Sequence, residues 1–424
     1  MKILVIGSGG REHAIVRALL RTASEPTEVV VAPGNAGIAL DARCVAINSD
    51  DVAAIVATAV DEAADLVVVG PEVPLVSGAV DALAAAGIAA FGPSAAAAKL
   101  EGSKVFSKEI MKAAVVPTAG HAVVHSHKEA LDQLACAAYP TVMKADGLAA
   151  GKGVVICPDE ASAREAASMF FVEQRFGPTD VVLEEHLVGR ELSLLAICDG
   201  ERAYPLTPAR DFKRIFDGDA GPNTGGMGSF SPVPEIAPEK LHHYSEMVHQ
   251  PIVDELAKRG TPFHGILYAG LMLTLDGPKV LEYNTRFGDP ETQAILPRLR
   301  CDLAALMLAS IKPGGLADAE LAFAPDAAVT ITLASAGYPE SSSSGDEISG
   351  LELVGDGIEV THAGTARGPA ENGNEAPLVT AGGRVLNVTA LGETVAQARE
   401  RAYAAAELIT FPGRQMRSDI AAGI

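Results

Sequence analysis

The chain has 424 residues, which is enough for roughly three domains of about 150 residues each. Hydrophobic residues make up 48% of it, so it can build cores, and a chain that is disordered throughout is excluded. Its formal net charge of −21 disfavours nucleic acid and anionic membranes as partners, although a few local cations can still bind a small phosphorylated substrate.

The five cysteines are odd in number, lie far apart and form no CxxC pair. This spacing argues against a disulfide framework and against a structural zinc site. The apolar start of the chain breaks at Gly7, too early for a signal segment, and no later apolar run is long enough for a membrane span. We therefore expect a soluble, cytoplasmic protein.

The first hundred residues alternate apolar strands with helices. The pattern predicts strands at 2–6, 28–32, 65–69 and 85–91, with helices at 11–21 and 52–60. Buried β-branched strands separated by helices are typical of a parallel sheet covered on both faces. The fold class predicted for this part is α/β.

A glycine-rich turn, Gly7-Ser8-Gly9-Gly10, follows the first strand and opens the first helix. A dinucleotide fingerprint would need glycine in place of Glu12 and an acidic residue at the end of the second strand. Both are missing, which disfavours an NAD-dependent oxidoreductase. What remains is a helix N-terminus suited to a single phosphate, or a plain strand–helix turn.

Two further polar residues, Asn35 and Glu72, follow the ends of neighbouring strands in this sheet. Ligands usually bind at that edge of a parallel sheet. Glu72 is therefore a candidate for binding ribose hydroxyls or an amine; the alternative is a solvated carboxylate.

Beyond residue 101 the pattern changes to longer strands and glycine-rich hairpins. A helix is predicted at 104–114, with strands at 139–145, 153–157, 180–185, 191–198 and 202–206. A helical region at 238–259 carries Pro251, which predicts a kink, and its histidines His242, His243 and His249 are expected at the surface. An antiparallel pair is predicted at 263–275 and 279–284.

The last hundred residues begin after a Pro-Gly-Gly boundary at 313–315. Strands are predicted there at 328–335, 358–363 and 384–390, followed by a final helix at 394–409. A polar loop is expected near 371–375. Chemical signals are weakest in this part of the chain.

A glycine-rich stretch between two predicted strands contains Gly147, Gly151, Lys152 and Gly153. Its spacing is not that of a P-loop, because three residues separate the first two glycines and glycine follows the lysine. Such a hairpin can fold its backbone amides over phosphates as a movable flap, with Lys144 adding a positive charge. The alternative is a mobile surface hairpin.

The segment from Leu281 to Glu291 carries the strongest chemical signal. On a strand, Glu282 and Asn284 point to one face, about 7 Å apart along the chain. Two such oxygen donors beside phosphates suit Mg²⁺. Arg286 could then clamp a carboxylate or a developing phosphoryl charge. The alternative is a surface strand of mixed charge.

Three weaker signals complete the set. The strand at 181–187 could bind a purine edge through its backbone, with Glu191 on ribose hydroxyls; taken alone, it fits a core strand with a charged end better. The charged run at 210–214 and the glycine-rich run at 221–228 together suit an anionic substrate in a cleft, and each alone fits a solvated loop equally well.

Taken together these segments resemble the ATP-grasp superfamily, and within it the glycinamide ribonucleotide synthetase (phosphoribosylamine–glycine ligase) family. The matching segments lie in order from Ile3 to about Leu391: ILVIGSGGREHA, VAPGNAG, VGPE, FGP, LEGSK, KADGLAAGKGV, GPNTGGMGSFSP, LYAGLML, LEYNTRFGDPETQ, HAGT and GGRVLNVTALG. One departure stands out. The family usually has Gln-Asp-His-Lys-Arg where this chain has Phe212 at the centre, so a proton-transfer role at that position is in doubt.

The resemblance implies a domain order and a set of site residues. The domains would be a pre-ATP-grasp domain at 1–101, an ATP-grasp region at 102–313 with a flap subdomain at about 118–190, and a small α+β domain at 314–424. Glu282 and Asn284 would bind Mg²⁺ or Mn²⁺. ATP would be bound by Lys104, Lys144, Gly147, Gly151, Lys152, Gly153, Glu185, Leu187 and Glu191. Phosphoribosylamine would face Gly9, Gly10, Asn35 and Glu72. The catalytic residues would be Arg286, Asp211 and Lys213, the first two facing glycine.

The implied reaction joins glycine to phosphoribosylamine with ATP, through a glycyl phosphate, as the second step of purine biosynthesis. A carboxylate is a poor electrophile, and phosphorylation makes it reactive; catalysis is then chiefly positioning and charge neutralisation. The substrates are small molecules, and we expect a monomer. Two alternatives are another ATP-grasp ligase, such as a carboxylase of the purine or biotin type, and a catalytically idle nucleotide-binding protein.

Overall fold

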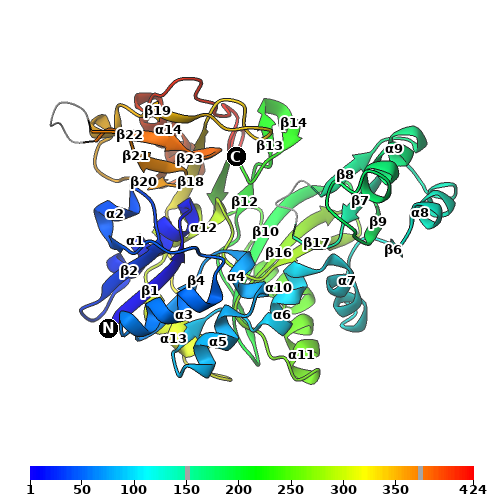
Figure 1. Cartoon of the computed structure of the whole chain (residues 1–424), viewed down its shortest axis with the longest axis horizontal. Coiled ribbons are helices and arrows are strands. Elements are labelled where there is room, and N and C mark those ends of the chain that lie inside the picture. Colours follow the sequence, from blue (N-terminus) through cyan, green and yellow to red (C-terminus); the bar gives the residue numbers. More distant parts are fainter. Residues whose placement is uncertain (149–152, 371–375) are drawn as a thin grey trace.

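The computed structural model describes residues 1–148, 153–370 and 376–424. Its N-terminal part is an open parallel sheet with strand order β3-β2-β1-β4-β5 (Figure 1). The strands are β1 (Lys2–Gly7), β2 (Glu28–Pro33), β3 (Arg43–Cys44), β4 (Leu66–Val69) and β5 (Ala90–Phe91). The helices are α1 (Gly10–Thr22), α2 (Ile38–Asp41), α3 (Val52–Asp61), α4 (Glu72–Val76) and α5 (Ala79–Ala85).

This sheet is buried on both faces because the inner positions of β1, β2 and β4 are all apolar. Ile3 and Val5 of β1 belong to one hydrophobic core, which α1 covers. Leu4 and Ile6 point the other way into a second core, together with α3 and α5. The α/β prediction is therefore confirmed. The strand predicted at 85–91 is shorter, because α5 continues to Ala85 and a turn at Gly87 (φ +76°) separates it from β5.

Two helices, α6 (Ala95–Gly102) and α7 (Lys104–Ala113), connect the first sheet to a four-stranded antiparallel sheet. Ser103 lies between them and caps α7 by accepting a hydrogen bond from the backbone N–H of Phe106. The antiparallel sheet, which we call the flap sheet, has the order β6-β9-β7-β8. It comprises β6 (His121–Val124), β7 (Thr141–Ala145), β8 (Val154–Cys157) and β9 (Val181–Glu185), with α8 (His127–Leu134) and α9 (Glu160–Phe171).

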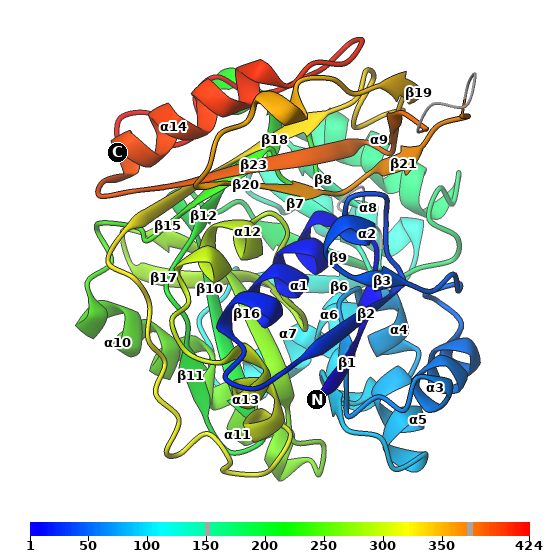
Figure 2. The same ribbon diagram turned by 90° about the vertical axis from the view of Figure 1, so that its left-hand side faces the viewer.

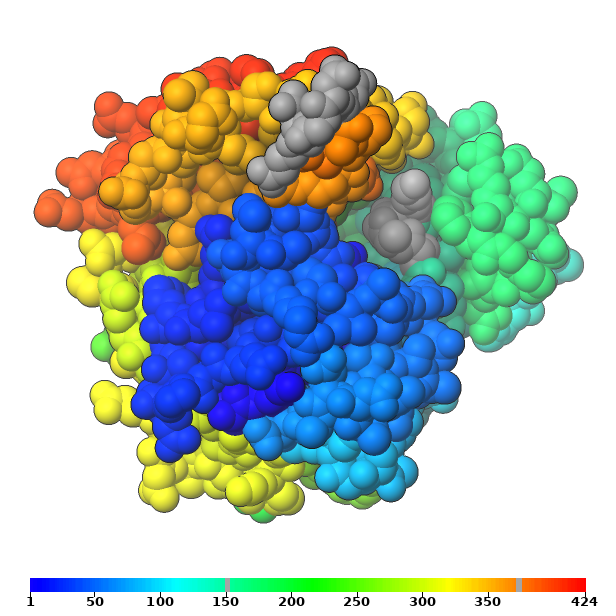
Figure 3. Space-filling view, turned by 60° about the vertical axis from the view of Figure 1, so that its left-hand side comes forward, coloured from blue at the N-terminus to red at the C-terminus, as the bar shows by residue number. Residues whose placement is uncertain are grey.

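The flap sheet and its two helices have a hydrophobic core of their own, which includes Met143, Phe170 and Leu183. In the space-filling view α9 and its neighbours form a green lobe that projects beside the blue N-terminal domain (Figure 3).

The central sheet has the order β11-β10-β16-β17 and lies between the N-terminal sheet and the flap sheet. Its strands are β10 (Arg190–Asp199), β11 (Ala203–Pro205), β16 (His264–Thr274) and β17 (Gly277–Asn284). The predicted antiparallel pair is confirmed, with Gly270 opposite Glu282 and Tyr268 opposite Asn284. Around it lie α10 (Pro238–Val248), α11 (Gln250–Lys258), α12 (Glu291–Ile295), η2 (Leu296–Arg298) and α13 (Leu303–Ser310).

The predicted kink near Pro251 is a break between α10 and α11 at His249. The expectation that His249 lies at the surface is wrong, because its ring is fully buried. The ring lies within hydrogen-bond distance of the Ser245 hydroxyl (3.2 Å) and of the Leu194 carbonyl on β10 (3.2 Å). Burial lowers the pKa of His249 to about 4, which keeps it neutral inside the core.

The C-terminal part shares a sheet with the central region. This sheet has the order β12-β15-β18-β23-β20 (Figure 2), and its first two strands come from the loop region between β11 and α10. The strands and turns of that loop region are β12 (Arg210–Asp211), β13 (Arg214–Phe216), η1 (Asp217–Asp219), β14 (Ala220–Asn223) and β15 (Gly228–Ser231). The remaining elements are β18 (Ala327–Ala334), β19 (Ser344–Glu347), η3 (Leu351–Leu353), β20 (Ile358–His362), β21 (Thr365–Arg367), β22 (Leu378–Ala381), β23 (Arg384–Gly392) and α14 (Val395–Leu408). Among the described residues, no helix is long and apolar enough to cross a membrane.

Candidate functional site

A cavity of about 520 Å³ lies where the N-terminal domain, the flap sheet and the central sheet meet. Most of the site residues predicted from the sequence line it: Glu72, Lys104, Lys144, Gly147, Glu185, Leu187, Glu191, Asp211, Lys213, Glu282, Asn284 and Arg286. Gly9, Gly10, Asn35 and Gly153 are described but are not part of its wall. Gly151 and Lys152 lie outside the described residues.

Two lysines on the flap side of the cavity share one buried carboxylate. Glu184 of β9 lies 2.8 Å from Lys108 Nζ of α7 and 2.8 Å from Lys144 Nζ of β7. Burial alone would raise the pKa of Glu184, but the charges of Lys144 and Lys108 hold it below its usual value. Glu184 therefore fixes the Lys144 ammonium at the cavity wall, where Lys144 also donates to the Leu281 carbonyl (3.1 Å).

Two further cations face the same space. Lys104 Nζ donates to the backbone carbonyl of Gly147 (2.9 Å), at the start of the predicted flap hairpin. Lys213 Nζ lies 2.9 Å from Glu191 Oε2. Burial opposes the charge of Lys213, but Asp211 and Glu191 raise its pKa well above the usual value, so this lysine stays protonated. The cavity wall thus brings four lysines (Lys104, Lys108, Lys144 and Lys213) together among its carboxylates.

The two predicted metal ligands lie on one face of β17 and both reach the cavity. Burial would raise the pKa of Glu282, but the charges of Lys213, Lys144 and Lys104 hold it below its usual value. Asn284 Oδ1 accepts a hydrogen bond from Arg286 Nη2 (3.1 Å), so its oxygen faces a cation.

An ionised carboxylate and an amide oxygen of this kind fit a hard divalent cation. Among residues 1–148, 153–370 and 376–424 there is no cluster of three or more His, Cys, Asp or Glu side chains that could hold a metal alone. A cation here would take its remaining ligands from substrate oxygens and water.

Arg286 joins the central sheet to the N-terminal region. Its Nη2 lies 2.9 Å from Glu101 Oε1 of α6, and its Nε lies 3.5 Å from Glu72 Oε2 of α4. Glu101 is buried and also accepts from the backbone N–H of Thr285 (2.7 Å). Burial opposes the charge of Arg286, but Glu101 and Glu72 raise its pKa, so the guanidinium is held charged and in one place.

Asn35 and the backbone at the start of α1 make hydrogen bonds within the protein. Asn35 Nδ2 donates to Ser8 O (2.8 Å) and to His362 O (2.9 Å) on the C-terminal part, while its Oδ1 accepts from two backbone N–H groups of the α2 turn. The N–H of Gly9 donates to Glu12 Oε2 (2.7 Å). Asn35 thus connects the N-terminal sheet to β20. From this side, Glu72 and Arg11 reach the cavity wall.

Several polar residues of this wall were not predicted from the sequence. Glu101, Lys108, Glu184, Glu291 and Arg384 all line the cavity. Glu101 and Glu291 lie inside the motifs LEGSK and LEYNTRFGDPETQ, so a search of those motifs for buried charge could have found them. Nothing in the sequence marks Lys108 or Arg384.

Phe212 is not part of the cavity wall, although its neighbours Asp211 and Lys213 are. Its ring lies 5.1 Å from the Arg417 guanidinium and 6.3 Å from the ring of Phe230. In this chain the Phe212 ring therefore packs against Phe230 and makes a cation–π contact with Arg417.

We expect Phe212→His to leave kcat within about threefold of wild type, because Asp211 and Lys213 on either side stay in place. The Arg417 charge next to an imidazole would keep it neutral, so no new acidic limb should appear in the pH–rate profile. A profile of kcat from pH 5 to 9 checks this. A large gain in rate with a new ionisation near neutral pH would contradict it.

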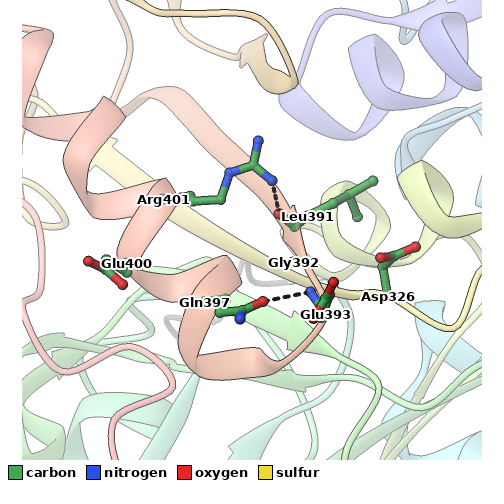
Figure 4. Close-up of a pocket in the computed structure, with 7 residues that line it drawn as sticks. All are labelled: Asp326, Leu391, Gly392, Glu393, Gln397, Glu400 and Arg401. Carbon is green, nitrogen blue, oxygen red and sulfur yellow. Dashed lines mark hydrogen bonds between the residues drawn. The ribbon is translucent and has the colours of Figure 1, made fainter.

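A second, shallower hollow lies on the C-terminal part, between β23 and α14 (Figure 4). Its polar groups bond to one another: Arg401 Nη1 donates to Leu391 O (2.6 Å), and the N–H of Glu393 donates to Gln397 Oε1 (3.1 Å). None of the predicted site residues lies there.

Family models match nearly the whole chain in three consecutive pieces. They are the phosphoribosylglycinamide synthetase N domain over residues 1–101, its ATP-grasp (A) domain over 102–292 and its C domain over 328–423. The chain is 49% identical to the phosphoribosylamine–glycine ligase of Streptomyces coelicolor, over 100% of this chain and 99% of that protein. It is 44% identical to the ligase of the same name from Caldanaerobacter subterraneus, over 100% of each chain.

Solved structures agree with these matches. The crystal structure of phosphoribosylamine–glycine ligase from Thermotoga maritima has a TM-score of 0.84 and 33% identity, over 99% of this chain and 100% of that one. The biotin carboxylase domain of Hydrogenobacter thermophilus 2-oxoglutarate carboxylase, in complex with MgADP and bicarbonate, has a TM-score of 0.70 at 18% identity, over 98% of this chain and 91% of that one. At that identity the second likeness concerns the fold alone.

Proposed function

The chain belongs to the phosphoribosylglycinamide synthetase family, and from this premise we propose that it ligates glycine to phosphoribosylamine at the expense of ATP. The products are glycinamide ribonucleotide, ADP and phosphate, in purine biosynthesis. The observation that carries the proposal is the single cavity that gathers Lys144, Glu282 and Arg286 from the flap sheet and the central sheet. Full-length relatives named phosphoribosylamine–glycine ligase support the choice of substrates.

ATP occupies the flap side of the cavity in this proposal. Lys104 and Lys144 neutralise its phosphates, and Gly147, Gly151, Lys152 and Gly153 bind them as well. The adenosine part is bound by Glu185, Leu187 and Glu191. The charge network around Glu184 supports this placement, because it already fixes Lys144.

Glu282 and Asn284 would hold Mg²⁺ or Mn²⁺, which supplies charge neutralisation at the phosphates when bound. Their fit rests on the ionised state of Glu282 and on the position of the Asn284 amide oxygen on the same face of β17.

The two other substrates meet on the opposite side. Phosphoribosylamine faces Gly9, Gly10, Asn35 and Glu72, and binding at Asn35 would require it to exchange hydrogen bonds that it now makes within the protein. Arg286 and Asp211 face glycine, and Lys213 faces the phosphoryl group.

A carboxylate oxygen of glycine attacks the γ-phosphorus in line, ADP departs, and the resulting glycyl phosphate is trapped by the amine of phosphoribosylamine. Arg286 orients the carboxylate and neutralises charge as it attacks. Flap closure excludes water, which would otherwise hydrolyse the acyl phosphate.

The proposal extends to the domain boundaries, the oligomeric state and the location of the protein. The domains divide at about residues 101 and 313, with a flap subdomain at about 118–190 that corresponds to the flap sheet and its helices. The enzyme acts as a monomer in the cytoplasm. The five cysteines are all free thiols, which suits a reducing compartment.

Heavy-oxygen transfer tests the reaction. With glycine labelled at both carboxylate oxygens, each released phosphate should carry one label and each product amide the other. The reason is that the bridging oxygen of the acyl phosphate leaves with phosphorus when the amine displaces it. Mass analysis of the phosphate checks this, with glycine and phosphoribosylamine each omitted in turn as controls. Unlabelled phosphate beside fully labelled product would exclude the acyl phosphate.

A further inference from the structure

The end of the chain lies against a hairpin outside the cavity. This hairpin, which we call the outer hairpin, consists of β13, η1 and β14, and Figure 1 shows the C-terminus beside it. Arg417 is 1% exposed, and its Nη1 donates to the backbone carbonyl of Arg214 in β13 (3.1 Å). The same guanidinium lies 5.1 Å from the centre of the Phe212 ring. Arg417 therefore contacts the backbone and the ring of the segment that leads from β12 into β13.

The tip of the outer hairpin is bound to the same end of the chain. Each residue of η1 makes a hydrogen bond to one residue of 417–419, a segment that we call the clamp. These bonds, each 2.8 Å long, join Asp217 to Ser418, Gly218 to Asp419 and Asp219 to Arg417. The clamp thus holds both the first strand and the tip of the hairpin.

The clamp is itself fixed in place. Asp419 accepts two hydrogen bonds from Arg417, from Nε to Oδ1 (2.7 Å) and from Nη2 to Oδ2 (2.7 Å). Such a bidentate pair fixes the plane of the guanidinium as well as its position. From α14, the Tyr403 hydroxyl donates to the Arg417 carbonyl (2.9 Å), and Arg399 Nη2 donates to the Ser418 carbonyl (2.6 Å). The clamp therefore connects the outer hairpin to the last helix.

The outer hairpin has little support of its own. Its two strands pair with each other only, in a two-stranded sheet. Among the residues of β13 and β14, Ile215 alone is buried, and all four residues of β14 are exposed. A two-stranded hairpin is marginally stable at best in water. Contacts from outside must therefore contribute to its position, and the clamp supplies them.

The inner side of the same segment carries two of the proposed catalytic residues. Asp211 and Lys213 line the cavity, whereas Phe212 between them faces the clamp. This alternation is that of an extended chain, whose successive side chains point to opposite sides. At the other end of the hairpin Thr224 also lines the cavity, and its N–H (2.7 Å) and hydroxyl (2.8 Å) both donate to the Lys213 carbonyl. A movement of the outer hairpin would therefore displace Lys213.

We propose that the clamp positions Asp211 and Lys213 for the reaction, with Arg417 as the positioning residue that acts through Phe212 and the Arg214 backbone. The inference rests on the proposed function, which gives Asp211 and Lys213 their roles. It deepens that function, because it makes the rate depend on a residue that lies outside the cavity wall. A displacement of about 1 Å caused by a remote substitution can lower a rate by about 100-fold.

The kinetic test compares Arg417→Gln with wild type in an ADP-release assay with ATP, glycine and phosphoribosylamine. Glutamine has neither the charge nor the guanidinium plane, so the contacts with Phe212 and Asp219 are lost. We expect kcat to fall about fivefold or more. The KM for ATP should stay within about twofold, because Lys104 and Lys144 do not contact the clamp.

The matched control is Arg414→Gln, in the same C-terminal segment. Arg414 donates to the Ala406 carbonyl (2.6 Å) and pairs with Glu407, both on α14. Its loss removes an arginine of the same segment without removing a contact to the outer hairpin. Both constants should stay within about twofold of wild type.

Hydrogen exchange followed by mass spectrometry separates positioning from general stability. In Arg417→Gln the amides of residues 211–225 should exchange about fivefold faster or more, while those of β18 and β23 keep their wild-type rates. If Arg417→Gln does not fold, Asp217→Ala/Asp219→Ala decides, because both side chains are exposed and bond to the clamp. This variant should lower kcat about twofold or more and speed exchange in the same residues.

A smaller fall in kcat, an equal change in the KM for ATP, or faster exchange that extends equally to β18 and β23 would overturn the inference. For the double variant, unchanged kcat or unchanged exchange would do the same. A wild-type enzyme without glycine-dependent ADP release would instead refute the proposed function, and with it the catalytic purpose of the clamp.

Discussion

Replacing Glu282 with Gln is expected to lower kcat/KM by about 100-fold or more, with the fold intact. The amide keeps the size of the side chain but removes the negative charge that three lysines face, so a two-ligand cation site loses its ionised member. Asn284→Leu should have a similar effect, because no other oxygen on β17 can replace the amide. ADP release over a range of Mg²⁺ concentrations measures the loss, and Mn²⁺ binding followed by electron paramagnetic resonance measures the site directly.

The control for this experiment is Glu160→Gln on α9, a carboxylate that is 51% exposed and pairs with Arg164 on the helix surface. It should behave as wild type. Normal turnover of Glu282→Gln at saturating Mg²⁺ would refute the assignment of the metal ligands, while the lysine assignments would stand.

The second large effect concerns stability. Arg286→Met should lower the free energy of unfolding by about 3–5 kcal/mol, because it leaves the buried Glu101 carboxylate without its cation. Chemical denaturation monitored by circular dichroism measures this loss. Activity should fall as well, since Arg286 is the group placed to bind the carboxylate of glycine.

The pH dependence of this effect has a definite sign. Burial raises the pKa of Glu101 above its value in the unfolded chain. The protonated form of Glu101 therefore stabilises the fold at low pH, and this contribution is lost as the pH rises through the pKa of the folded state. Removing Arg286 raises that pKa further. The loss of stability in Arg286→Met should therefore be larger at pH 8 than at pH 5.

The double variant Arg286→Met/Glu101→Gln, in which residue 101 carries no charge, should recover part of the stability at pH 8. An equal loss at both pH values, with no recovery in the double variant, would show that Arg286 stabilises by packing alone.

Local patterns in the sequence predicted the main strands, the first and last helices and several residues that line the cavity. The alternation in β17 placed Glu282 and Asn284 on one face, and the structure has both at the cavity. Continuous apolar runs predicted the parallel sheet. A strand that is buried on both faces does not alternate apolar with polar residues, so its sequence is a continuous apolar run.

Partners distant in sequence could not be predicted in the same way. Glu101 bonds to Thr285, and Glu184 bridges Lys108 and Lys144, but nothing near any of these residues indicates the pairing. His249 is buried because β10 supplies a carbonyl 55 residues earlier in the chain, a contact that helical periodicity does not encode. Arg384 reaches the cavity from a strand of the C-terminal part, where the sequence carried little chemical signal.

The sheet that β15 and β18 share has a consequence for how the polypeptide can be divided. β15 lies before residue 313 and β18 after it, and their four paired positions join the two parts edge to edge. A fragment that ends at residue 313 would expose β15 as an open edge, a ready template for aggregation. Produced together, the two fragments could pair through these strands and a common apolar core, and so complement each other as a split enzyme. Transplanting the last hundred residues between homologues would likewise succeed only where the donor's first strand matches this edge.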